Sequence, residues 1–152
     1  MPSKPPGCVS SEILRRAMSQ ENVEIVGRLM DAWNRQDLEG ILALIDPEAE
    51  YVNAPNAVEP GTRRGHDAIV VVMRKLWEGI PGALQEIDRF HDRGDEIITE
   101  GRLSRTMPGS DARISNPLLI SWKFRDGKLI RLETLGAGPE FPGALEAAGL
   151  RE

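Results

Sequence analysis

The chain contains few residues of the kinds that form disulfides or bind transition metals. One cysteine, Cys8, and two histidines, His66 and His91, occur in 152 residues. A single cysteine excludes an internal disulfide, and so few sulfur and imidazole ligands leave little from which to build a zinc or iron site. The sequence also has no glycine-rich dinucleotide loop and no pair of carboxylates at metal-binding spacing. We therefore expect neither a metal nor another cofactor.

Aromatic residues are also scarce, and acidic residues outnumber basic residues. The net charge is −5, and the chain has three tryptophans, three phenylalanines and one tyrosine. An acidic chain with so few aromatic side chains argues against a nucleic-acid-binding surface.

The longest uninterrupted apolar run, Ala68 to Met73, is much shorter than a bilayer-spanning helix. Gly7-Cys8 is similar to a lipoprotein cleavage site, but no apolar stretch precedes it, so we expect no signal, no membrane partner and a cytoplasmic location.

The remaining composition is typical of one globular domain. Hydrophobic residues make up 40% and charged residues 28% of the chain. Residues 1–17 contain three prolines and show no period, whereas Ser19 is placed to cap a helix. We interpret residues 1–18 as a flexible tail, or as the product of an upstream start, and residues 19–150 as a single domain.

Three helices are predicted in the first half of the chain. The first covers residues 21–35, where apolar residues recur at helical spacing. The second is capped by Asp37, carries apolar residues as far as Ile45, and stops before Pro47. The third begins near residue 65 or 66 and ends at Gly79, after an apolar stripe.

The second half of the chain has the pattern of strands. After a strand over residues 48–53 and a loop over residues 54–65, strands are predicted over residues 84–91 and 96–107 and in a hairpin over residues 114–135, and a terminal helix over residues 144–150. This order predicts an α+β fold, a cystatin-like conical barrel in which a curved antiparallel sheet wraps over three N-terminal helices. Gly101, in the middle of a strand, predicts a bulge or bend. A small molecule would bind in the cavity between sheet and helices.

The hairpin at Asp126-Gly127 decides which side chains face that cavity. A two-residue turn would place Ile120 opposite Glu133 and bring charged side chains inside. A three-residue turn, with Gly127 in a left-handed bulge, would place Ile120 opposite Leu132 and gather the apolar residues on one face. We predict the three-residue turn because it separates apolar from charged side chains.

Four short sequence segments resemble those of a known family. They are SQENVEIVGRLMDAWNRQDLEGILALIDPEAEY, RGHDAI, WKFRDGKLIRLE and the ending ALEAAGL. Over residues 19–150 the chain resembles the SnoaL-like polyketide cyclases of the nuclear transport factor-like (ketosteroid-isomerase-like) superfamily. The resemblance implies the fold and a homodimer formed through the outer face of the sheet. It implies no single activity, because the fold hosts cyclases, isomerases, dehydratases, epoxide hydrolases and proteins with no known reaction.

Ketosteroid isomerase offers one mechanism for comparison. There an aspartate base moves a proton while a tyrosine and a protonated aspartic acid hold the oxyanion. The resemblance places the base at Asn53, the tyrosine at Leu29 and the partner acid at Ile120. None of these side chains can perform that chemistry, so the resemblance implies the shape of the isomerase without its mechanism.

Tyr51, Asn53 and His66 are the residues to which chemistry could be assigned. Tyr51 and Asn53 share one face of a strand and could orient a carbonyl or hydroxyl of a ligand, with Tyr51 as a weak acid. The alternative is a buried tyrosine and a turn-forming asparagine. His66 could be a general base at the cavity mouth, or only a solvated residue at the start of a helix.

The remaining pocket candidates are aromatic residues and inward-facing polar residues. The three tryptophans come from two helices and the sheet, and they could form flat walls for a planar or polycyclic ligand or pack the core. Each polar residue on the inner face could contact a ligand or be a satisfied core group. The predicted pocket comprises Trp33, Tyr51, Asn53, Trp77, Thr99, Asn116, Ile120, Trp122 and Thr134.

Two functions from different classes follow from these residues. The first is a pocket protein that binds a small, mainly apolar or polycyclic metabolite. The second is a cofactor-independent enzyme of isomerase, cyclase or hydrolase type that uses acid–base chemistry in the cavity. The inner sheet face, in the predicted register, carries no ionisable side chain, and this favours the first.

Overall fold

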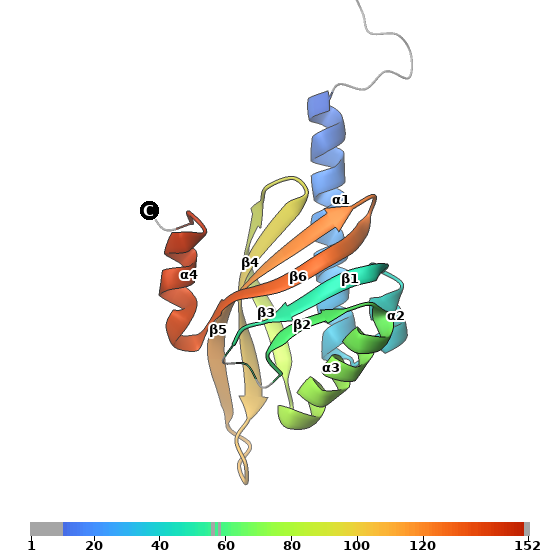
Figure 1. Cartoon of the computed structure of the whole chain (residues 1–152). Helices are drawn as coiled ribbons and strands as arrows, with labels where there is room; N and C mark the ends of the chain where they lie inside the picture. Colours follow the sequence, from blue (N-terminus) through green and yellow to red (C-terminus); the bar gives the residue numbers. More distant parts are fainter. Residues whose placement is uncertain (1–10, 56, 58, 151–152) are drawn as a thin grey trace, which may run out of the picture.

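The computed structural model describes residues 11–55, 57 and 59–150, and it has four α-helices, one 3-10 helix and six strands within them (Figure 1). In chain order the elements are α1 (Ser11–Asn34), α2 (Leu38–Leu42), β1 (Ile45–Asn53), β2 (Gly61–Arg64), α3 (His66–Gly79), β3 (Leu84–Asp92), β4 (Glu96–Thr106), β5 (Arg113–Arg125), β6 (Lys128–Ala137), η1 (Gly138–Glu140) and α4 (Phe141–Ala147). No helix in these ranges is both long and apolar enough to cross a bilayer.

The six strands form one sheet in the order β2-β1-β6-β5-β4-β3. This confirms the predicted α+β class with a curved sheet over three helices. The sheet is not wholly antiparallel, however, because β1 and β6 run parallel. The β1–β6 pairing joins the first and last strands of the chain within the sheet, and β2 and β3 form its edges.

Helix boundaries differ from the prediction at three places. α1 begins at Ser11 rather than after Ser19, and the rest of the predicted tail, residues 1–10, lies outside the described residues. Ile45 is not in α2: it begins β1, where it is buried and pairs with Leu129 of β6. α4 begins at Phe141 rather than at residue 144, since Pro142 is tolerated in the first turn of a helix.

One strand was not predicted at all. β2 lies inside the segment expected to be a loop, and it pairs antiparallel with the end of β1, Asn53 opposite Gly61. Four residues that follow Pro60 show no alternation that would mark them as a strand. Their conformation comes from pairing at the edge of the sheet.

The turn predicted for the β5–β6 hairpin is wrong, and so is the predicted pairing, because Ile120 pairs with Thr134 rather than with Leu132. The prediction that Ile120, Trp122 and Leu132 face the core is right. Arg125 pairs with Lys128, so the turn has two residues, and Asp126 and Gly127 both have positive φ, at 52° and 76°. The register then shifts at Ile130, which has no partner in β5. This bulge adds one residue to β6 and reverses the faces of everything beyond it.

Beyond the bulge, the charged residues of the two strands again lie on the face opposite to Ile120, Trp122 and Leu132. Trp122 pairs with Leu132 and Ile120 with Thr134, while Lys123 pairs with Arg131 and Ser121 with Glu133. Ile120, Trp122 and Leu132 belong to the buried core. A second shift leaves Leu135 without a partner.

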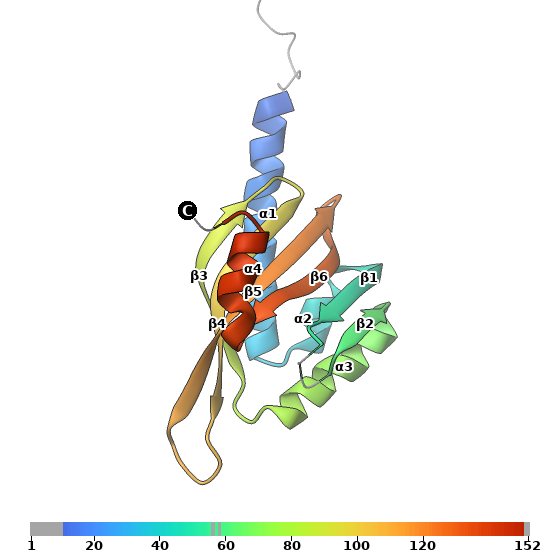
Figure 2. The ribbon, with the colours of Figure 1, turned by 60° about the vertical axis from the view of Figure 1, so that its left-hand side comes forward.

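Helices cover both faces of the sheet. α1, α2 and α3 pack on the inner face, where the main core lies, and α4 lies across β5 and β6 on the outer face (Figures 1 and 2). Gly136 permits that approach, because a Cβ there would lie 2.5 Å from the Cβ of Ala144. In both views the β4–β5 hairpin and the first turns of α1 project beyond the sheet.

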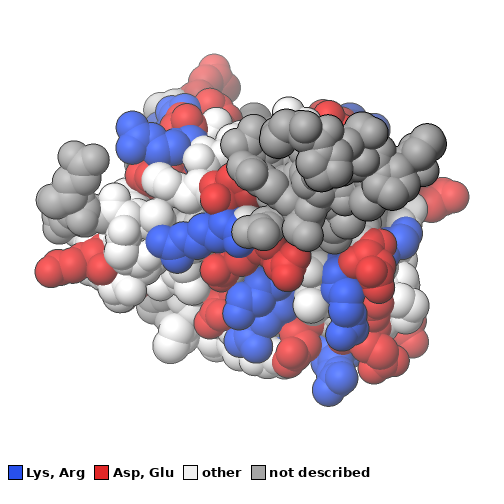
Figure 3. Space-filling model, turned by 90° about the horizontal axis from the view of Figure 1, so that it is seen from above, with Lys and Arg blue, Asp and Glu red and all other residues white. Residues whose placement is uncertain are grey.

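Charged side chains pair on the outer face. Arg131 lies 3.8 Å from Glu50 and 3.3 Å from Glu133, and Arg102 of β4 bonds Glu86 and Asp88 of β3. On the face seen along α1, acidic and basic side chains are interspersed rather than gathered by sign (Figure 3). Such mixing gives no basic patch on that face.

Gly101 shows why a glycine stands in the middle of β4. The opposite strand bulges at Asp88, and a Cβ on Gly101 would lie 2.1 Å from the backbone oxygen of Glu86. The predicted bend is thus confirmed, and no side chain fits between the strands.

Gly101→Ala should lower the free energy of unfolding by about 2–3 kcal/mol, because the backbone of β3 would have to move. Gly27→Ala is the matched control: a Cβ at Gly27, in α1, meets nothing within 4 Å. It should raise the free energy of unfolding by about 0.5–1 kcal/mol, because alanine has the better helix propensity. Urea unfolding of both variants tests this; equal stabilities would contradict it.

Candidate functional site

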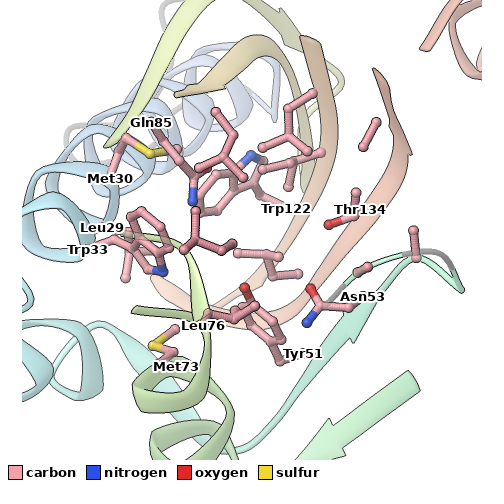
Figure 4. Close-up of a pocket in the computed structure, with 18 of the residues that line it drawn as sticks. Leu29, Met30, Trp33, Tyr51, Asn53, Met73, Leu76, Gln85, Trp122 and Thr134 are labelled. Atoms are coloured by element: carbon pink, nitrogen blue, oxygen red, sulfur yellow. The ribbon is translucent and has the colours of Figure 1, made fainter. Parts of the chain in front are cut away.

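A cavity of ≈ 380 Å³ lies between the inner face of the sheet and helices α1, α2 and α3 (Figure 4). Its wall is mostly apolar. The helices contribute Leu29, Met30, Trp33, Ile41, Ile69, Met73 and Leu76, and the strands contribute Ile45, Ala49, Leu103, Leu118, Ile120, Trp122, Leu129 and Leu132. The side chains with polar atoms around it are Glu50, Tyr51, Asn53, Gln85, Arg105, Asn116 and Thr134.

β1 supplies the two polar residues that lie deepest. Alternation along the strand buries Ala49, Tyr51 and Asn53 on the inner face. Asn53 Nδ2 donates to the backbone oxygen of Glu59 at 2.8 Å, which fixes the orientation of the carboxamide and leaves Oδ1 toward the cavity. No described residue bonds the Tyr51 hydroxyl, which Figure 4 shows turned toward the same space.

Burial controls the ionisation of Tyr51. Desolvation raises the pKa of its hydroxyl to about 12. At neutral pH the hydroxyl therefore keeps its proton. It can donate a hydrogen bond, but it cannot serve as a base.

The three tryptophans occupy different depths. Trp33 and Trp122 line the cavity, whereas Trp77 does not: it packs against Trp33, with ring centroids 5.8 Å apart. Trp122 Nε1 donates to Thr99 Oγ1 at 2.9 Å, so Thr99 is a satisfied core group behind the wall. Among the described residues, the Nε1 atoms of Trp33 and Trp77 are buried and have no partner.

Seven of the nine predicted pocket residues line the cavity, and Trp77 and Thr99 do not. Asn116 is exposed, at the mouth of the cavity. His66 is not in the wall either: its Nε2 lies 3.2 Å from the backbone oxygen of Ile45 and connects α3 to the start of β1.

Three polar residues of the wall were not predicted: Glu50, Gln85 and Arg105. Gln85 is held by α1, since its backbone exchanges two hydrogen bonds with the side chain of Asn34, at 2.8 and 2.9 Å. Its Oε1 is buried without a partner among the described residues. Arg105 lies on the inner face of β4, near the open end, and corrects the expectation that this face carries no ionisable side chain. Alternation from Leu103 would have placed it there.

The positions implied by ketosteroid isomerase do meet at this cavity. Leu29, Asn53 and Ile120 all line it. Glu50 also contributes to the wall, but its carboxylate pairs with Arg131 on the other side. The arrangement can hold an apolar molecule and offer it neutral hydrogen-bonding groups.

Tyr51 is the only tyrosine, so absorbance at 295 nm reports its ionisation directly. In the folded chain the titration midpoint should lie at about 12, and in urea near the ordinary value of 10.0. Below pH 10 the contribution of this group to stability is complete. Between about 10 and 12 it is lost, because the unfolded chain releases the proton and the folded chain keeps it; the loss is of the order of 3 kcal/mol.

Tyr51→Phe is the control for this titration, since it removes both the absorbance step and the alkaline fall in the free energy of unfolding. A midpoint near 10 in the folded wild type would contradict the burial of the hydroxyl.

Comparisons with known proteins agree with the fold. The chain is 28% identical to an NTF2-like protein of Burkholderia thailandensis, with a TM-score of 0.66 over 85% of this chain and 95% of that one. It is 24% identical to TerC, co-crystallised with polyporic acid, with a TM-score of 0.68 over 83% and 98%. A ketosteroid isomerase-like protein of Catenulispora acidiphila, in complex with trimethylamine, is 17% identical, with a TM-score of 0.66 over 84% and 94%.

Sequence comparisons give the family. No curated protein sequence matches the chain. The profile of the SnoaL-like domain matches residues 26–132, which is more than half of the sequence and includes β1, α3, β5 and the first half of β6. The protein belongs to the SnoaL-like domain family.

Proposed function

We propose that this protein binds a small, mainly apolar molecule in the cavity between the sheet and α1, α2 and α3. The observation that carries the proposal is the composition of the wall: mostly aliphatic and aromatic side chains surround ≈ 380 Å³ of space. Of its two charged side chains, Glu50 pairs with Arg131 and Arg105 is exposed near the open end. Such a site suits a ligand with an apolar body and few polar atoms.

Two of the similar structures support binding in this fold. TerC was co-crystallised with polyporic acid, and the protein of Catenulispora acidiphila with trimethylamine. Both are less than 25% identical to this chain, so they support the capacity of the fold and not a particular ligand.

The alternative is a cofactor-independent enzyme that uses acid–base chemistry. Tyr51 could donate a proton, but its pKa of about 12 makes it a poor base at neutral pH. Among the described residues of the wall there is no histidine or aspartate, and the carboxylate of Glu50 is engaged by Arg131. Binding is therefore the better-supported function.

The homodimer implied by the family resemblance stays a prediction. α4 covers part of the outer sheet face, over β5 and β6. A partner would have to contact the part that α4 leaves open, which includes the charge pairs of Arg102 with Glu86 and Asp88.

Fluorescence of the neutral naphthyl ketone Prodan tests the proposed binding. Prodan should bind the native protein and emit at shorter wavelength, because the wall of the cavity excludes water. Leu118→Trp should weaken binding at least tenfold, since residue 118 lines the cavity and is half-buried, so a larger side chain enters the space without disrupting the core.

Leu84→Trp is the matched control, because Leu84 is 39% exposed and is not in the wall. It should leave Prodan affinity unchanged. Equal affinity in the two variants would place the dye elsewhere and refute binding in this cavity, as would the absence of binding to the wild type.

A further inference from the structure

The two innermost polar groups of β1 have complementary chemistry and no partner in the protein. Tyr51 and Asn53 are each 8% exposed. The Tyr51 hydroxyl and Asn53 Oδ1 receive no hydrogen bond from any described residue, and Figure 4 shows both turned into the cavity. Trp33 Nε1 and Gln85 Oε1 also lack a partner among the described residues, but these atoms are buried within the wall. The two groups of β1 instead face the cavity, and polar groups of such buried side chains are normally bonded, so they point to a ligand.

The structure also fixes which atom each residue offers. Asn53 Nδ2 is occupied by the Glu59 backbone oxygen, so Oδ1, an acceptor, is the free atom. Tyr51 keeps its proton at neutral pH, so its hydroxyl can donate as well as accept, and beside the acceptor Oδ1 its O–H is the complementary group. Side chains two residues apart in a strand share a face and lie about 7 Å apart at the backbone, near enough to contact one ligand.

Resting on the binding function proposed above, we propose that the cavity selects a neutral ligand with a hydroxyl group on an apolar ring system. The ligand oxygen accepts a hydrogen bond from the Tyr51 hydroxyl, and the ligand O–H donates to Asn53 Oδ1. A hydroxyl is the smallest group that both accepts and donates. An ether or ketone satisfies Tyr51 alone, and a carboxylate or phenolate brings its negative charge to Asn53 Oδ1.

Three naphthalene probes that differ in a single substituent distinguish the hydrogen bond from Tyr51 from the hydrogen bond to Asn53. 2-Naphthol can accept from Tyr51 and donate to Asn53, 2-methoxynaphthalene can only accept, and 2-methylnaphthalene can do neither. Equilibrium dialysis gives a dissociation constant for each probe with the wild type and with Tyr51→Phe, Asn53→Ala and Gln20→Ala. For each variant, the affinity of 2-naphthol and of 2-methoxynaphthalene is divided by the affinity of 2-methylnaphthalene. These two ratios are compared between variants, so that differences in the hydration of the free probes cancel.

Tyr51→Phe should lower the relative affinity for both oxygen-bearing probes about tenfold, because both lose the donor. The variant removes an unpaired hydroxyl and keeps the ring, so it should fold. Asn53→Ala should lower the relative affinity for naphthol alone. Gln20→Ala is the control: it removes an exposed carboxamide of α1 that does not line the cavity, and it should change neither ratio.

The remaining outcomes overturn the assignment. If Asn53→Ala weakens all three probes equally, its effect comes from the lost bond to Glu59, and Asn53 does not contact the hydroxyl. If the ratios are the same in every variant, the hydroxyl is not recognised, although apolar binding stands. If 2-methylnaphthalene and Prodan both fail to bind the wild type, the proposed function itself fails, and the hydroxyl assignment with it.

Discussion

One unpaired residue, Ile130, determines what kind of cavity this protein has. The two-residue turn at Asp126-Gly127 sets a register that would place Trp122 opposite Arg131. The bulge at Ile130 moves the pairing by one, so that Leu132 faces Trp122 and Arg131 faces Lys123. Because side chains alternate along a strand, this single residue turns two charges outward, where Arg131 pairs with Glu50 and Glu133.

The predicted core-facing side of the hairpin is right although its predicted turn and pairing are wrong, and the reason is physical. Burial acts on every residue of a long strand, so the alternation of apolar and polar side chains identifies the inner face without the turn. Nothing in a single sequence marks which residue will be left unpaired. The same limit explains Ile45 and β2, whose conformation depends on partners distant in the chain or at a sheet edge.

The alternation of side chains along a strand predicts which residues face the interior, but it does not predict which of them reach the cavity. Thr99 and Trp77 are interior, as expected, yet each lies behind the wall, bonded by Trp122 or packed against Trp33. Gln85 reaches the cavity because Asn34 of α1 holds its backbone, a contact between residues that the sequence does not connect. Tyr51 and Asn53 could be predicted because one strand positions both.

The hydroxyl of Tyr51 is a feature of the cavity that packing does not explain. A phenylalanine would fill nearly the same volume, and leaving a buried hydroxyl without a partner costs about 1–3 kcal/mol. Desolvation by the surrounding protein, which raises the pKa of the group to about 12, is the source of that cost. A ligand oxygen that accepts a hydrogen bond from Tyr51 would remove this free-energy cost in the complex. Ligands that carry an acceptor should therefore bind more tightly than ligands that do not. The carboxamide of Asn53, held in one orientation by Glu59, extends that preference to ligands that also donate.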